Sequence, residues 1–209
     1  MPFKSVDAGA GLERFATILQ GVDSVYETDL LKPIVDTIVS RSNLSADNRS
    51  IRIIADHLRC STFMIADGIR PGNLGREYIL RRLLRRTFLH SQLAGIDIGV
   101  LQETTVRVQK VFSPYYPELK NAGELINHIL EQELSIFERT LNRGLQEFEK
   151  IVSRSRNIIS GNDAFKLHDT FGFPIEMTKE LAHMRGLAID EERFKECFEE
   201  HRRRSRRKP

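Results

Sequence analysis

The 209-residue sequence predicts a mainly α-helical fold. Apolar residues recur every three or four positions along most of the chain, which is typical of the buried face of amphipathic helices. Extended segments are scarce, and only the first eight residues and residues 157–159 have the composition of a strand. A chain of this length can bury a substantial core in one domain, or in one domain with a short appendage.

The first three expected helices lie before residue 68. Residues 11–21 place four apolar side chains on one helical face, namely Leu12, Phe15, Ile18 and Leu19. Residues 29–40 are typical of a second, short helix. A longer amphipathic helix follows, with Asp47 as its expected N-cap and with an apolar stripe that continues to Ile65.

Glycine and proline at Gly68, Pro71 and Gly72 then predict a loop. Five further helices are expected over residues 74–93, 100–112, 123–152, 176–186 and 190–203. The segment AFKLHDTFGFP, which precedes the last two of these helices, is expected to end at a Gly–Phe–Pro turn.

The charge distribution points to a phosphate-bearing partner. The chain has 32 Lys and Arg against 29 Asp and Glu, a net charge of +3. Residues 70–90 contain six arginines but a single acid, Glu77, and the C-terminal tail holds a second basic cluster. Clustered arginine suits phosphate groups, so the arginines of 70–90 favour a nucleic-acid or nucleotide partner. For the tail, a solvated charged surface is the better interpretation.

Other classes of protein are disfavoured. No apolar run approaches the ~20 residues that span a bilayer, and the N-terminus does not resemble a secretory signal. Two cysteines, Cys60 and Cys197, do not make a disulfide framework, and the histidines and cysteines lack the spacing of metal ligands. The sequence therefore predicts a cytoplasmic protein with no metal site and no membrane partner.

The expected helix over 74–93 has two chemically different faces. At 100° per residue, one face carries Arg81, Arg82, Arg85 and Arg86, and the other carries Ile79, Leu80, Leu83 and Leu84. The aliphatic face is expected to dock on the domain, so that the arginines face outward toward a phosphate backbone. A solvated charged face is the alternative interpretation.

A second motif opens the chain, with the sequence DAGAGLER at residues 7–14. Alternating glycines that lead directly into a helix allow a ligand to approach the backbone closely, and Arg14 places a positive charge one turn into that helix. An ordinary glycine turn is the simpler interpretation of these eight residues taken alone.

Together, DAGAGLER and the following YETDLLKP resemble the third signature motif of class II aminoacyl-tRNA synthetases, in the form found in alanyl-tRNA synthetases. The resemblance continues through the segments at 54–87, 131–145, 160–178 and 190–206, in the order of that family. It implies that residues 1–45 are a remnant of the α+β catalytic domain and that residues 46–209 form a helical domain that recognises the tRNA acceptor stem.

The resemblance also implies roles in nucleotide binding. Arg14 matches the arginine expected to hold the γ-phosphate of ATP, and Asp7, Gly9 and Gly11 match positions that shape the adenosine side of the pocket. A guanidinium there offsets charge as pyrophosphate leaves. ATP and Mg²⁺ are implied for the complete enzyme, whereas this chain alone is expected to bind ATP weakly or not at all.

Two polar residues are candidates for base recognition. The resemblance implies that Asn73 and Asp169 read a G·U wobble pair near the end of the alanine tRNA acceptor stem. The A-form minor groove is wide and shallow, and the guanine 2-amino group is a hydrogen-bond donor there. The alternative roles are ordinary: Asn73 as a cap or turn residue, and Asp169 as part of an Asx turn.

The family's two earlier catalytic motifs are expected before residue 1, and its editing domain after residue 209. The complete enzyme would attach alanine to tRNA with ATP, with no DNA partner, whereas the isolated chain is expected to lack alanine-dependent ATP–pyrophosphate exchange. The alternative is a non-catalytic RNA-binding or regulatory paralogue, or a truncated gene product, derived from the same domain.

Overall fold

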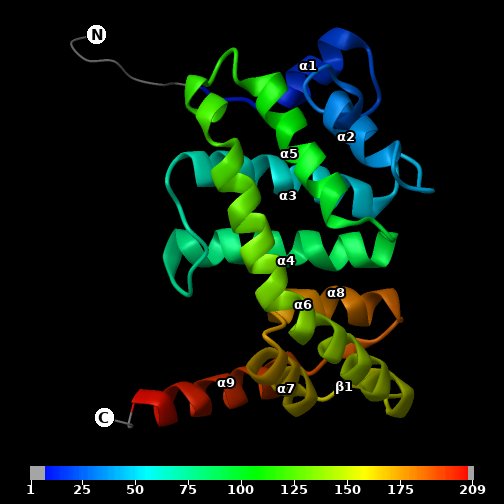
Figure 1. Cartoon of the computed structure of the whole chain (residues 1–209). Coiled ribbons are helices and arrows are strands. Elements are labelled where there is room, and N and C mark those ends of the chain that lie inside the picture. The colour runs from blue at the N-terminus through cyan, green and yellow to red at the C-terminus, as the bar shows by residue number, and fades with distance from the viewer. Residues whose placement is uncertain (1–7, 207–209) are drawn as a thin grey trace. The chain divides into compact units, whose positions relative to one another are not determined.

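A computed structural model describes residues 8–206, with side chains described through residue 203. The described chain is mainly helical, as predicted. Its α-helices, labelled in Figure 1, are α1 Leu12–Gln20, α2 Lys32–Val39, α3 Arg49–Ala66, α4 Gly75–Ala94, α5 Ile98–Phe112, α6 Gly123–Arg154, α7 Gly161–Phe171, α8 Ile175–Met184 and α9 Glu191–Arg206. Two 3-10 turns, η1 Val25–Glu27 and η2 Pro117–Asn121, and two short strands, β1 Ile158–Ile159 and β2 Ala188–Ile189, complete the element order.

The chain divides into two compact units between Glu131 and Gln132, within α6. The division between 45 and 46 that the resemblance implies is a boundary between family domains, and it stays a prediction. In the first unit α2 packs against α3 and α5, so the segments on either side of residue 45 share one core.

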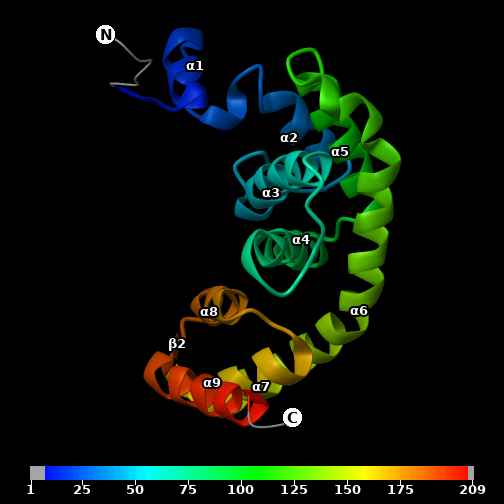
Figure 2. The same cartoon turned by 90° about the vertical axis from the view of Figure 1, so that its left-hand side faces the viewer.

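The first unit is built around α3, which packs against both α4 and α5. Helices α3 and α4 lie side by side in both views, joined by a loop over 67–74 (Figures 1 and 2). Their buried apolar side chains include Ile51, Ile54, Leu58 and Ile65 from α3, and Leu80, Leu84, Phe88 and Leu89 from α4. The apolar stripe predicted for α3 is therefore the one that the structure buries.

The N-terminus of α3 corrects one expectation. Asn48, not Asp47, is the N-cap, and its side-chain oxygen accepts a hydrogen bond from the Ser50 backbone N–H at 2.9 Å. Asp47 instead forms an ion pair with Arg52. Asparagine and aspartate cap helices about equally well, so sequence preference does not decide between adjacent candidates.

In the second unit, β1 pairs in parallel with β2, through Ile158 with Ala188 and Ile159 with Ile189. The extended segment predicted at 157–159 is confirmed, whereas β2 was not predicted. The expected strand over the first eight residues lies almost wholly outside the described residues.

Helix α7 was also not predicted as a separate helix. The Ser160 hydroxyl accepts from the Asp163 N–H and caps its start, and Gly172 ends it with a φ of 62°. Helix α7 packs against α9 and α8.

Gly144 of α6 lies under the aromatic ring of Phe173, which is fully buried. A Cβ atom at position 144 would lie 2.3 Å from Phe173 Cε2, well inside van der Waals contact. The absence of a side chain here is what allows the Gly–Phe–Pro segment to pack on α6.

We expect Gly144→Ala to destabilise the protein by about 1–3 kcal/mol, because overpacking a buried ring costs more than the ~1 kcal/mol that alanine gains over glycine within a helix. Urea unfolding followed by circular dichroism measures this change. Gly123→Ala is the control, since the atoms nearest to its Cβ would belong to the side chain of Gln109, at 3.3 Å or more. A Gly144→Ala variant as stable as the wild type would contradict the packing described here.

Candidate nucleotide and nucleic-acid sites

The glycine-rich segment reaches the start of α1 with an open backbone. Gly11 is the N-cap of α1, and a Cβ atom added at Gly9 would meet no atom within 4 Å. Arg14, in the first turn of α1, has an exposed side chain. A phosphate-bearing ligand could therefore approach both the backbone and the guanidinium. Asp7 lies outside the described residues.

The predicted apolar face of α1 exists, but no described residue covers it. Its members are 53–84% exposed: Leu12 67%, Phe15 53%, Ile18 76% and Leu19 84%. Monomeric proteins rarely leave a contiguous apolar face of this kind in water. This exposed face is a candidate packing surface.

The other side of α1 is attached to α3 by an ion pair between Glu13 and Arg59, with Oε1 and Nη1 at 2.5 Å. The hydrogen bond from Arg59 holds the pKa of Glu13 below its usual 4.5. The neighbouring turn η1 is attached to α3 as well, because the Tyr26 hydroxyl donates to Asp56 Oδ2 at 2.6 Å. Burial and that hydrogen bond raise the pKa of Tyr26 to about 12.

Helix α4 differs in part from its predicted arrangement. Arg81, Arg82, Arg85 and Arg86 are all half-buried rather than fully turned to solvent. Leu89, on the arginine side of the helix, is fully buried, whereas Ile79, on the expected docking side, is 42% exposed. Helical periodicity gives the direction of each side chain around the helix axis, whereas the neighbouring elements determine which of these directions are buried.

Arg86 contacts a histidine of α3. Its Nη1 lies 3.0 Å from His57 Nε2, and a guanidinium only donates, so Nε2 is the acceptor and the ring proton sits on Nδ1. His57 is thus a hydrogen-bonding partner within the helix pair.

The loop before α4 brings together two of the predicted site residues. Arg81 donates through Nη1 to Asn73 Oδ1 and through Nη2 to the Pro71 carbonyl at 3.2 Å. Asn73 itself is exposed. The hollow of about 470 Å³ that begins at the next residue, Leu74, is lined by charged side chains of both signs, Arg70, Arg76, Asp67 and Glu77. The loop therefore presents the exposed Asn73 amide close to a hollow of mixed charge.

Asp169 lies in the last turn of α7, in the second unit, and not in the Asx turn considered as its alternative role. Its Oδ1 is 2.9 Å from Nδ1 of His201 on α9, and its side chain is 42% exposed. Next to it, the His168 ring packs against Phe194 and Phe198, and His168 Nδ1 lies 3.1 Å from the Phe173 carbonyl. Sequence reasoning missed His201, because the tertiary packing of α7 on α9 creates this contact between residues 32 positions apart.

The predicted site residues are thus divided between the two units of the chain. Arg14 with Gly9 and Gly11, and Asn73 with the four arginines, belong to the first unit, whereas Asp169 belongs to the second. The part of the basic tail that the structure describes is exposed, and Arg203 pairs with Glu199 at 3.4 Å. Residues 8–203 contain no cluster of side chains arranged to hold a metal ion. None of the helices described here combines the length and apolar character needed to cross a membrane.

The ion pair of Glu13 gives a test of how α1 is attached. Because the pKa of Glu13 is lowered in the folded state, its contribution to stability is present above pH 4.5 and is lost as pH falls through the lowered value. We expect Glu13→Gln to be less stable than the wild type by up to about 1 kcal/mol at pH 7, and the difference to vanish at acid pH.

Thermal midpoints of both proteins between pH 3 and pH 7 measure this effect. Glu103→Gln is the control, since it removes a more exposed pair in which the carboxylate is 3.4 Å from Arg41. A Glu13→Gln deficit that is independent of pH would show that the ion pair does not stabilise α1.

Comparison with known proteins assigns the chain to a family. The family model described as tRNA synthetases class II (A) matches residues 1–209. The chain is 44% identical over 216 aligned residues to alanine–tRNA ligases of Mycobacterium ulcerans (strain Agy99) and of Mycobacterium tuberculosis (strain ATCC 25618 / H37Rv), which covers 99% of this chain and 24% of each relative. It thus spans about a quarter of their length. The chain belongs to the class II tRNA synthetases, in the branch of the alanine–tRNA ligases.

Proposed function

We propose that this chain is the part of an alanine–tRNA ligase that joins the ATP-binding end of the catalytic domain to the acceptor-stem recognition domain. The observation that carries this proposal is the extent of the similarity: 44% identity runs across 99% of the chain and is not confined to the glycine-rich motif. The complete enzyme would attach alanine to its tRNA with ATP, in the cytoplasm. Residues 1–45 are assigned to the catalytic domain and residues 46–209 to tRNA recognition.

Within this function, Arg14 would hold the γ-phosphate of ATP. Its exposed guanidinium near the open backbone of Gly9 fits a polyphosphate, because both the charge and the access are present. Asp7 would complete the adenosine side. ATP supplies the leaving pyrophosphate that drives formation of the aminoacyl adenylate. Mg²⁺ is proposed for the complete enzyme, and no ligand for it is assigned to the described residues.

The exposed face of α1 supports this assignment to a larger catalytic domain. Leu12, Phe15, Ile18 and Leu19 form an apolar surface that the described residues leave in water. At about 25 cal/mol per Å², covering such a surface is favourable. The relatives are about four times as long as the aligned segment, and the rest of their catalytic domain is the natural cover for this face.

Recognition of tRNA would use two kinds of contact. Arg82, Arg85 and Arg86 of α4 would act on phosphates of the acceptor stem, which fixes the position of the RNA without reading its sequence. Asn73 and Asp169 would read the wobble pair in the minor groove, where Asp169 accepts from the guanine 2-amino group. The half-exposed carboxylate of Asp169, oriented by His201, is suited to accept such a hydrogen bond.

Binding of an alanine-type acceptor minihelix separates these two kinds of contact. We expect Arg82→Ala to weaken binding to the G·U stem and to a G·C-substituted stem by similar factors. The salt slope, which is the slope of the logarithm of the binding constant against the logarithm of the salt concentration, is expected to fall in magnitude by about one unit. Asp169→Ala is expected to keep the salt slope and to lose about five- to 150-fold of the preference for G·U, which corresponds to about 1–3 kcal/mol.

Fluorescence anisotropy of labelled minihelices at several salt concentrations measures both quantities. Glu192→Ala is the control, because it removes an exposed carboxylate from the same unit, on the first turn of α9. If Asp169→Ala retains the wobble preference, the assignment of this residue to base recognition is wrong.

A further inference from the structure

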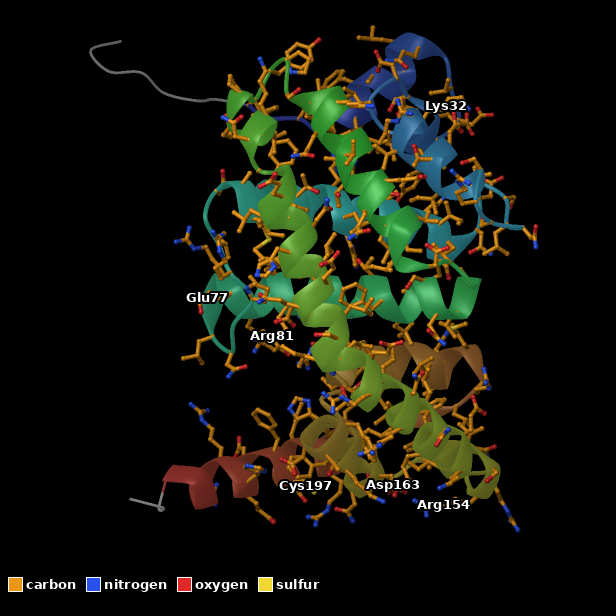
Figure 3. All side chains as sticks on the ribbon, in the orientation of Figure 1. Lys32, Glu77, Arg81, Arg154, Asp163 and Cys197 are labelled. Carbon is orange, nitrogen blue, oxygen red and sulfur yellow. The ribbon has the colours of Figure 1, made fainter. Side chains whose placement is uncertain are left out.

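Arg81 is set apart from the other arginines of α4 by what it contacts. It lies in the second turn of the helix and reaches back over the loop, where its two terminal nitrogens contact the Asn73 side chain and the Pro71 carbonyl. Figure 3 labels Arg81 together with Glu77, at the end of α4 that carries this loop. Both terminal nitrogens of the guanidinium are thus engaged with the chain itself.

The chemistry of this contact fixes the orientation of the Asn73 amide. A guanidinium has donors and no acceptor, so the atom that faces it is the amide oxygen, Oδ1. The amide nitrogen, Nδ2, with its two donors, is therefore directed away from Arg81. Asn73 is exposed, so these donors are accessible to a ligand.

The backbone of the loop is fixed to the same helix. The Gly72 N–H donates to the Glu77 carbonyl at 3.1 Å, and the Tyr78 N–H donates to the Leu74 carbonyl at 3.1 Å. Arg81 adds two contacts to this arrangement, and its Nε is buried. The loop and the first two turns of α4 thus form one connected element that presents the Asn73 amide.

We propose that Arg81 is a positioning residue for Asn73 and not a phosphate contact, and that it directs the amide donors of Asn73 toward the acceptor atoms of the wobble pair. This inference rests on the proposed reading of the G·U pair. Pyrimidine O2 and purine N3 are acceptors in the minor groove, whereas the guanine 2-amino group is a donor. Asn73 then contacts the acceptors, whose positions differ between a wobble pair and a Watson–Crick pair, whereas the donor is the atom proposed for Asp169.

A lysine substitution distinguishes positioning from phosphate binding. Lysine keeps the positive charge, but it lacks the planar fork that contacts two oxygens in a fixed geometry. We expect Arg81→Lys to keep the wild-type salt slope and to lower the preference for a G·U over a G·C minihelix by about fivefold or more. Arg107→Lys is the matched control: it makes the same change at an exposed arginine of the first unit, on α5, which also donates to a side-chain oxygen, that of Thr37, and we expect it to keep the preference.

A second variant tests the orientation of the amide. Asn73→Asp retains an oxygen for Arg81 but replaces the donor group with an acceptor. We expect this variant to lose the wobble preference as fully as Asn73→Ala does, while its thermal midpoint stays at or above that of the wild type. This variant tests the proposal even if Arg81→Lys is poorly folded.

A stem with inosine in place of the guanine tests which atoms of the base pair each residue contacts. The I·U pair lacks the 2-amino group but retains the N3 and O2 acceptors. We expect Asp169→Ala to bind G·U and I·U stems equally, and Arg81→Lys to discriminate between them as the wild type does.

Three results would overturn the inference. If Asn73→Ala loses the wobble preference but Arg81→Lys keeps it, Arg81 does not position Asn73. If Arg81→Ala weakens binding to the G·U and G·C stems equally and lowers the salt slope by about one unit, Arg81 is a phosphate contact. If Asn73→Ala keeps the preference, the proposed reading of the base pair by Asn73 fails, and the inference fails with it.

Discussion

The packing of α3 against α4 is the contact on which the first unit depends. Helix α4 must bury Leu80, Leu84 and Phe88 against its neighbours and still carry the arginine cluster at positions 81, 82, 85 and 86. The helix resolves this by leaving the arginines half-buried, because their aliphatic stems can cover apolar surface while the guanidinium reaches a polar partner. His57 and the loop before α4 are two such partners. The hydrophobic contact thus decides where the positive charges lie.

Periodicity was enough to locate most of the helices. Long helices such as α3 and α6 repeat their apolar stripe over several turns, so sequence patterns identify them well. Helix α7 was missed because it is short and ends at a Gly–Phe–Pro segment that is typical of a turn. Strand β2 has only two residues, and a strand of that length carries no periodic signal.

The candidate site was predicted less completely, for a different reason. The sequence identified Arg14, Asn73 and Asp169 through a resemblance, and the structure adds the groups that contact Asn73 and Asp169. The Arg81–Asn73 and His201–Asp169 contacts depend on how one element lies against another, and local patterns contain no information about that. The exposed apolar face of α1 is a further example. The sequence shows that this face exists, but it does not show which residues, if any, pack against it.

The Tyr26–Asp56 hydrogen bond has a spectroscopic consequence. The chain has no tryptophan and four tyrosines, so its near-ultraviolet absorbance comes largely from phenol groups. Tyr26, with its pKa raised to about 12, remains un-ionised in the folded protein at pH values where an ordinary phenol, with a pKa of 10.0, has lost its proton. Its stabilising contribution is present below pH 10 and is lost as pH rises toward 12. Tyrosinate absorbance is therefore an intrinsic optical reporter of whether η1 remains attached to α3.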